Sequence, residues 1–121
     1  MYDVKIINGE AILFEDDNQV ENLEYLRNNG NIRYDFTDGS YVCIFSYNTI
    51  IWYDYNDKCH RDGDMPAYIN TGGYLLYYNH GKWHRVDGPA VILSNGREEY
   101  WLDGIRYTKE EYDTEMATRN A

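Results

Sequence analysis

Short apolar runs separated by glycine- and asparagine-rich turns recur along the whole chain. Near its start, residues 4–7 and 11–14 are two such runs with Asn8-Gly9 between them. Runs of this length bounded by turn residues are typical of β-strands, and Asn-Gly supplies the positive φ values of a two-residue hairpin turn. The pattern therefore predicts a series of antiparallel β-hairpins.

The clearest of these hairpins lies between residues 90 and 104. An apolar run, 90–93, leads into the turn at Asn95-Gly96, and residues 97–102 then alternate. Alternation places Tyr100 and Leu102 on one face of a strand and Trp101 on the other. A second hairpin turn follows at Asp103-Gly104.

The N-terminal half shows the same pattern in a less regular form. Asp38-Gly39 predicts a turn before the strand-forming run 41–45, and residues 50–53 are its expected partner across Tyr47-Asn48. Residues 23–26 resemble the strand 99–102 and lead into the turn at 28–30. A short helix over residues 18–27 is the alternative for this segment.

A different pattern begins after residue 107. Thr108 and Glu111 have the spacing of a capping box, in which each side chain satisfies a free N–H group at a helix start. Residues 109–118 are therefore predicted to be helical, with Tyr112 and Met116 one turn apart. We expect this helix to cover the open edge of the last hairpin, which would otherwise invite strand addition.

An internal repeat underlies the hairpins. Residues 84–90 read His-Arg-Val-Asp-Gly-Pro-Ala, and residues 60–67 contain His, Arg, Pro and Ala in the same order with one extra residue. Beyond the prolines a spacing of about 23 residues holds. Repeated units at a fixed spacing do the same structural work in each copy, so the recurring histidines are expected to tie neighbouring turns together. The repeat positions are His60, Pro66, Gly73, His84, Pro89 and Gly96.

These motifs resemble a known group of repeats. Tyr78, Gly81 and His84 form Tyr-x-x-Gly-x-x-His, followed by Gly, an apolar strand, Asn-Gly and another aromatic residue. This order is similar to the MORN repeat, and the His-Arg-x-Asp-Gly-Pro-Ala version resembles a variant in proteins of bacteriophages and large DNA viruses. The resemblance implies a twisted, single-layer ribbon of hairpins that acts as a binding or scaffolding surface.

Length and composition fit one all-β domain. Its 121 residues divide into degenerate acidic hairpins (1–51), two clear repeats (52–107) and a C-terminal helix with a tail (108–121). The 14 tyrosines suit a ribbon with little interior, since one ring face can pack while the hydroxyl stays hydrated. Two cysteines, no signal segment and no long apolar run indicate a cytoplasmic protein without membrane contact.

Charge is distributed unevenly. Residues 1–57 contain 11 acidic and 3 basic side chains, whereas residues 58–121 contain 10 and 8, within a net charge of −10. A field of this sign repels nucleic acid and favours basic partner surfaces.

Enzymatic chemistry finds little support in the residues. His60 and His84 lie near aspartates, but no spacing supplies the further ligands of a metal site, so no metal or cofactor is expected. Cys43 lies within an apolar strand. Cys59 is flanked by cationic residues that favour a thiolate, yet it aligns with Trp83, which favours packing. The sequence therefore predicts a binding protein.

Two binding modes use different halves of the chain. In the first, an acidic face meets a basic groove as a nucleic-acid mimic would, although a solvated surface explains the same charges; its residues are Glu15, Asp16, Asp17, Glu21, Glu24, Asp35, Asp38, Asp54 and Asp57. In the second, Arg61, Lys82, Arg85 and nearby tyrosines line a cleft for an anion such as a nucleotide, with ordinary hydrogen bonding in the repeat turns as the alternative.

The resulting hypothesis is a small viral or phage inhibitor that occupies a basic surface on a host protein, such as a CRISPR effector or another nucleic-acid-handling defence component. Two alternatives are a scaffold that self-associates through hairpin edges, with a homodimer as its simplest form, and a protein that sequesters small anionic signalling nucleotides.

Overall fold

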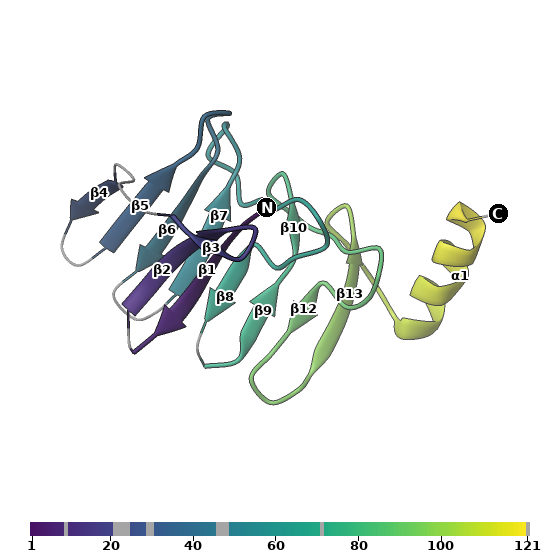
Figure 1. Ribbon diagram of the computed structural model, residues 1–121. Helices are drawn as coiled ribbons and strands as arrows, with labels where there is room; N and C mark the ends of the chain where they lie inside the picture. Colours follow the sequence, from purple (N-terminus) through teal and green to yellow (C-terminus); the bar gives the residue numbers. More distant parts are fainter. Residues whose placement is uncertain (9, 21–24, 29–30, 46–48, 71, 121) are drawn as a thin grey trace.

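A long antiparallel meander forms the body of the molecule (Figure 1). The computed structural model describes residues 1–8, 10–20, 25–28, 31–45, 49–70 and 72–120. Along the large sheet the strands follow one another in chain order: β4 (Tyr25–Asn28), β5 (Asn31–Asp35), β6 (Tyr41–Phe45), β7 (Thr49–Tyr53), β8 (Tyr68–Asn70), β9 (Tyr74–Leu76), β12 (Val91–Ile92), β13 (Glu98–Leu102) and β14 (Ile105–Tyr107). The predicted all-β hairpin architecture is confirmed.

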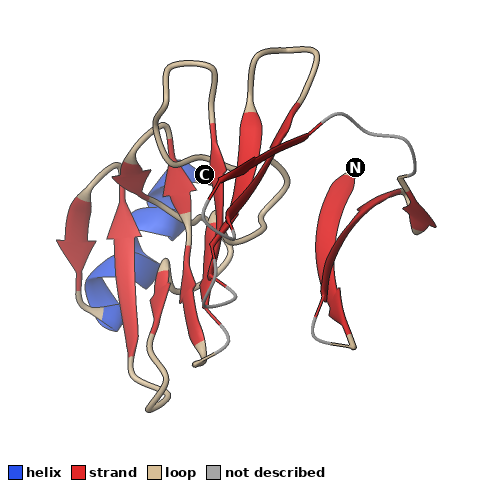
Figure 2. Cartoon of the chain, turned by 90° about the vertical axis from the view of Figure 1, so that its left-hand side faces the viewer, coloured by secondary structure: helices blue, strands red, loops and turns tan. Residues whose placement is uncertain are grey.

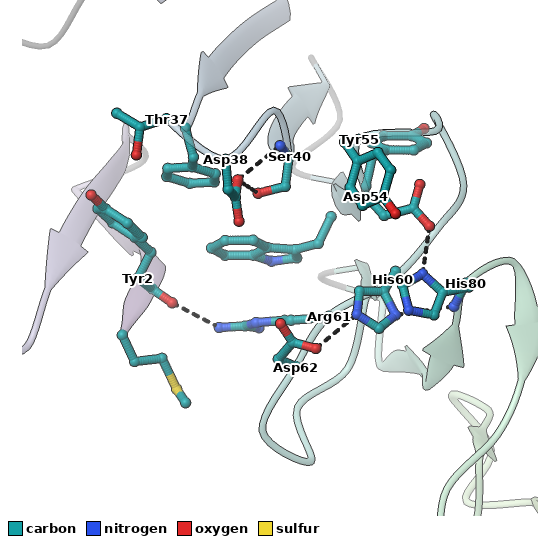
Figure 3. Close-up of a pocket in the computed structure, with 14 residues that line it drawn as sticks. Tyr2, Thr37, Asp38, Ser40, Asp54, Tyr55, His60, Arg61, Asp62 and His80 are labelled. Atoms are coloured by element: carbon teal, nitrogen blue, oxygen red, sulfur yellow. Dashed lines mark hydrogen bonds and ion pairs between the residues drawn. The ribbon is translucent and has the colours of Figure 1, made fainter.

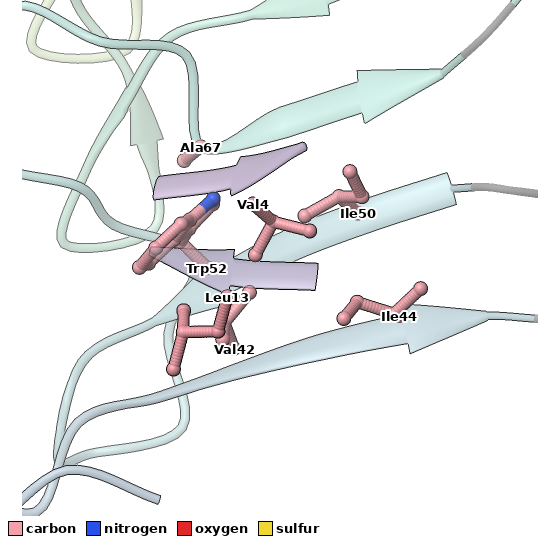
Figure 4. Packing of buried hydrophobic residues seen from close by; sticks show 7 residues of the cluster. All are labelled: Val4, Leu13, Val42, Ile44, Ile50, Trp52 and Ala67. Atoms are coloured by element: carbon pink, nitrogen blue, oxygen red, sulfur yellow. The ribbon is translucent and has the colours of Figure 1, made fainter. Parts of the chain in front are cut away.

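A second, smaller sheet lies against one face of the large one. It consists of β1 (Tyr2–Ile7), β2 (Glu10–Glu15) and β3 (Asn18–Gln19), and Figure 2 shows it opposite the larger sheet. Val4 and Leu13 of this sheet pack into a core with Val42, Ile50 and Trp52 (Figure 4). The expected single layer is therefore wrong for this half of the molecule, which has two layers and a true interior.

Alternation along β6 and β7 explains why the second layer can form. Val42 and Ile44 on β6, and Ile50 and Trp52 on β7, point to the same side and are each at most 7% exposed. Such a stripe would leave a large apolar surface in water if the ribbon had one layer. Burying it beneath the first hairpin removes that surface from solvent, which is the main favourable contribution to folding.

The C-terminal helix α1 (Lys109–Arg119) begins as the sequence predicts. Glu111 donates its backbone N–H to the Thr108 hydroxyl, and its carboxylate accepts from the Thr108 N–H. Tyr112 is the buried residue of the helix, and its hydroxyl donates to the Arg85 carbonyl at 2.8 Å. The helix contacts β13 and β14, so it covers the C-terminal end of the sheet as expected.

The helix considered for residues 18–27 is not present where the structure describes that segment, because residues 18–19 and 25–28 are strands. Turns expected at Asn8-Gly9, at residues 28–30 and at Tyr47-Asn48 fall wholly or partly outside the described residues. Within the described part of the chain, no helix has the length and apolar character needed to span a bilayer.

Candidate functional site

The repeated histidines occupy matching positions in two successive units. One unit contains the small hairpin β10 (Tyr78–Asn79) and β11 (Lys82–Trp83), and the next contains the hairpin of β13 and β14. His60 accepts a hydrogen bond at Nδ1 from the backbone N–H of His80 at 3.0 Å, and His84 accepts one from Asp103 at 3.0 Å. In each unit the histidine thus accepts a backbone hydrogen bond from the turn of the next hairpin.

Glycine completes this docking of turns. The N–H of Gly81 donates to the Cys59 carbonyl at 2.8 Å, and the N–H of Gly104 donates to the Trp83 carbonyl at 3.0 Å. In both turns the backbone has a positive φ at the glycine and at the preceding residue, as two-residue hairpin turns require. Glycine is the residue that adopts this conformation without strain.

The repeated arginines also have structural roles. The Arg61 guanidinium lies 4.1 Å over the Trp52 ring and donates to the Pro66 carbonyl, while Arg85 lies 3.9 Å over Tyr77 and donates to the Pro89 carbonyl. Arg61 is 5% exposed at its side chain and also donates to the Tyr2 carbonyl and the Asp3 carboxylate. Each arginine therefore fastens the loop that follows it to the sheet.

These contacts do not assemble the predicted cleft for an anion. Arg61 is enclosed, and Arg85 is bound to the Asp64 carboxylate at 2.9 Å. Lys82 lies on β11, where its stem faces the turn at Gly104. The hydrogen-bonding alternative for the repeat turns accounts for Arg61 and Arg85. The remaining repeat positions, Gly73 and Gly96, both have positive φ in hairpin turns.

A cleft of about 600 Å³ opens between the N-terminal strand and the loops at one end of the large sheet (Figure 3). Its lining combines rings with carboxylates: Tyr2, Phe36, Trp52, Tyr53, Tyr55, His60 and His80, together with Asp38, Asp54 and Asp62. Concave sites that join apolar walls to a few polar groups are the usual form of binding sites. Among the described residues, this cleft is the best candidate functional site.

A stack of rings forms one wall of the cleft. Tyr2 stacks on Phe36 with ring centres 4.3 Å apart, and Phe36 stacks on Trp52 at 5.9 Å. The Arg61 guanidinium covers the next face of the indole. This continuous stack joins β1 to the loops after β5 and β7, and it fixes the wall before any ligand arrives.

Asp54 is buried at the side of the cleft. The prediction that it belongs to an exposed acidic face is therefore wrong. Its side chain is 4% exposed and lies 2.7 Å from the His80 Nδ1. Burial alone would raise the pKa of Asp54, but hydrogen bonds from His80 and from the N–H groups of Lys58 and Asn56 outweigh it and lower the pKa. Asp54 organises the 54–58 loop from within.

Two other carboxylates remain at the mouth of the cleft. Asp38 accepts hydrogen bonds from the backbone N–H and the hydroxyl of Ser40, which lower its pKa. Asp62 accepts from the His60 Nε2 at 2.8 Å, and its side chain is 94% exposed. Tyr55 lies on another side of the mouth and is 68% exposed. The mouth is thus acidic with an open aromatic ring.

The other residues of the predicted acidic face have mixed settings. Asp16 is paired with the N-terminal amino group of Met1, which itself lines the cleft, and Asp57 accepts from the Tyr41 hydroxyl at 2.7 Å. Asp35 is paired with Arg33, and Asp17 lies 3.6 Å from Lys5. Glu15, Asp16, Asp17, Asp35, Asp38 and Asp57 are all exposed, whereas Glu21 and Glu24 lie outside the described residues.

Sequence reasoning missed Asp62 and Tyr55 as site residues. In the sequence, Asp62 is one of the aspartates near His60, and Tyr55 is one tyrosine among 14. The packing of the first hairpin on the large sheet places both residues around one cleft with Tyr2. Cys59 packs against the hydrophobic core, and burial raises the pKa of its thiol to about 12.

No group of three or more histidine, cysteine or acidic side chains is arranged to hold a metal ion within the described ranges. Comparisons with protein-family models, with curated proteins and with solved structures found no match. The functional argument therefore depends on the geometry and charge of this cleft and its surroundings.

Proposed function

We propose that this protein binds a basic surface on another protein and thereby blocks what that surface normally contacts. The net charge of −10 and its concentration in residues 1–57 support an electrostatic partner of opposite sign. Charge complementarity of this kind steers association and selects partners.

The observation that carries the proposal is the placement of carboxylates around one end of the sheet. Asp38 and Asp62 border the cleft, Asp16 is bound to the Met1 that lines it, and Asp57 belongs to the same loop as Tyr55. Exposed carboxylates around a concave, aromatic-lined opening form a local patch with both charge and shape. A solvated surface kept for solubility would need only the charge.

The partner class that fits best is a protein that handles nucleic acid, because grooves for phosphate backbones are lined with lysine and arginine. An acidic protein in such a groove competes directly with nucleic acid. The resemblance of the repeat to phage and viral proteins extends the proposal to a host defence component, including a CRISPR effector, as the target.

A salt titration tests the electrostatic basis. A partner captured from bacterial lysate at low ionic strength is purified, and its affinity is measured as salt rises. We expect steep weakening, because exposed charge pairs are screened beyond a Debye length of about 8 Å at physiological salt. Duplex DNA added to the complex should compete with the protein for the partner.

Matched variants sharpen this test. A variant carrying Asp16→Asn, Asp38→Asn and Asp57→Asn removes three charges near the cleft, whereas Glu98→Gln, Glu110→Gln and Asp113→Asn remove three from the C-terminal part. We expect the first set to weaken binding more than the second. Affinity that is insensitive to salt and to both sets would overturn the proposal, and a defined homo-oligomer by light scattering would favour the scaffolding alternative.

A further inference from the structure

We propose that the cleft is the receptor for a single arginine side chain of the partner, held between the carboxylates of Asp38 and Asp62 and against the ring of Tyr55. This inference rests on the proposed function and adds the contact at its centre. All five residues line the cleft, and Figure 3 shows Asp38 in the upper part of the view, Asp62 in the lower part, and Tyr55, His60 and His80 towards the right.

Charge selects a cation for this position. Arg61 lines the cleft, but its guanidinium already donates hydrogen bonds to Asp3 and to two backbone carbonyls. His60 accepts a backbone N–H at Nδ1, so the proton on its ring lies at Nε2, where it is directed to Asp62. Among the described lining residues, the mouth therefore has two exposed carboxylates and no exposed lysine or arginine to balance them, and the amino group of Met1 is paired with Asp16.

The hydrogen bonds of these carboxylates favour a planar donor. The Oδ1 atom of Asp38 is the one that Ser40 contacts, and the Oδ1 atom of Asp62 is the one that His60 contacts. These hydrogen bonds do not use the Oδ2 atom of either carboxylate. A guanidinium has five N–H donors in one plane and can reach two carboxylates at once, whereas an ammonium is a compact point charge.

Aromatic rings are a second feature of the cleft that favours a guanidinium group. Among the described residues, guanidinium groups stack on aromatic faces at Arg33 on Tyr41, Arg61 on Trp52 and Arg85 on Tyr77, with separations of 3.7, 4.1 and 3.9 Å. Tyr55 presents an open ring of the same kind at the cleft mouth, 68% exposed. Cation–π stacking with paired carboxylates is therefore the recognition chemistry that the cleft offers.

The cleft has room for an entering side chain. A cleft of about 600 Å³ lies within the range of ligand pockets, which extends from about 300 to 1,000 Å³. One arginine side chain is much smaller than this space, so it would occupy part of the cleft and leave room for neighbouring residues of the partner. Buried arginines at interface centres are common sources of binding energy.

The direct test is a titration of the 15N-labelled protein with an oligoarginine peptide, with an oligolysine peptide of equal length as the comparison. We expect amide shifts concentrated at Asp38, Tyr55 and Asp62, and affinity for oligoarginine at least about tenfold above that for oligolysine. Shifts spread evenly over all acidic segments, or equal affinities for the two peptides, would overturn the arginine receptor.

Single substitutions separate this inference from the function beneath it. Asp38→Asn and Asp62→Asn keep an acceptor for Ser40 and His60, and Tyr55→Ala keeps the Cβ that lies beside Gly39. Glu110→Gln, an exposed charge on α1, and Tyr74→Ala, an exposed ring on β9, are the matched controls. Thermal unfolding of every variant identifies any that fail to fold.

In the complex with the captured partner, each cleft variant should weaken affinity about tenfold, against less than about twofold for the controls. If Asp38→Asn and Glu110→Gln weaken binding equally while the salt dependence persists, the arginine receptor is wrong and the electrostatic function stands. If salt has no effect, the proposed function fails together with this inference.

Discussion

His60 and His80 stack with ring centres 3.8 Å apart, and the backbone N–H of His80 donates to the Nδ1 of His60. The backbone bond repeats one unit later between Asp103 and His84, although Asp103 has no ring to stack. The feature that both repeat units share is therefore the histidine Nδ1 atom, which accepts the backbone hydrogen bond. The stacked ring of His80 is an addition that borders the cleft.

This comparison predicts the effect of replacing His84. His84→Ala removes the acceptor of the Asp103 N–H, which lies in an exposed turn, and should lower the free energy of unfolding by about 0.5–1.5 kcal/mol. In His84→Asn the side-chain carbonyl oxygen is bonded to Cγ, as the histidine Nδ1 is, so this variant should retain most of that stability. Chemical denaturation of the three proteins measures both differences, and equal losses for Ala and Asn would contradict the acceptor role.

The repeat could be recognised in the sequence because the structural role of each repeated position requires a particular residue type. An imidazole acceptor, a glycine with positive φ and a proline carbonyl recur at fixed spacing, so the alignment of His60 with His84 predicted matching backbone settings. The roles of Arg61 and Arg85 were harder to predict, because a cation beside tyrosines suits an anion site as well as a cation–π contact. Only coordinates show that their donors already have acceptors.

The contacts of Arg61 predict that replacing it will lower the stability of the fold. Arg61→Lys keeps the charge but cannot stack as a plane on Trp52 while donating to the Pro66 and Tyr2 carbonyls. Its midpoint of thermal unfolding should fall by several degrees, which corresponds to about 1–2 kcal/mol in a domain of this size. Arg97→Lys, at a side chain 60% exposed, is the control and should change little.

The two-layer core predicts a large effect at Leu13. This side chain is 2% exposed between the small sheet and β6, so Leu13→Ala should cost about 2–5 kcal/mol of unfolding free energy. Ile7→Ala, at a residue 42% exposed on β1, should cost much less. A loss at Leu13 below about 1 kcal/mol would mean that the first hairpin does not pack on the large sheet in solution.

The second layer could not be predicted from hairpin patterns alone. Residues 11–14 and residues 90–93 are both short apolar runs, so the hairpin pattern predicts one continuous ribbon that contains them both. The difference lies in what they face: Leu13 covers the stripe of Val42 and Trp52, whereas β12 joins the ladder of the large sheet. Local periodicity fixes which residues share a face, but it does not state which sheet that face meets. The cleft lies where the first hairpin meets the large sheet, so it could not be predicted from the hairpin pattern either.

Asp54 links the stability of the cleft to pH. Its pKa in the folded protein lies below the ordinary value of 3.8, so its contribution to stability is present above that pH and is lost as pH falls through the folded value. Asp54→Asn keeps an oxygen for the N–H groups of Asn56 and Lys58 but removes the charge facing His80. The variant should be less stable than the natural protein at neutral pH, and this gap should narrow as the solution is acidified below about pH 4.

Denaturant unfolding at a series of pH values measures that gap. Leu13→Ala removes stability without removing a titratable group, so its gap to the natural protein should stay constant over the same range. If the two gaps change in parallel, the acid sensitivity belongs to the fold as a whole. A gap that narrows for Asp54→Asn alone assigns it to the buried carboxylate, because protonation then abolishes in the natural protein the same charge that the substitution removes.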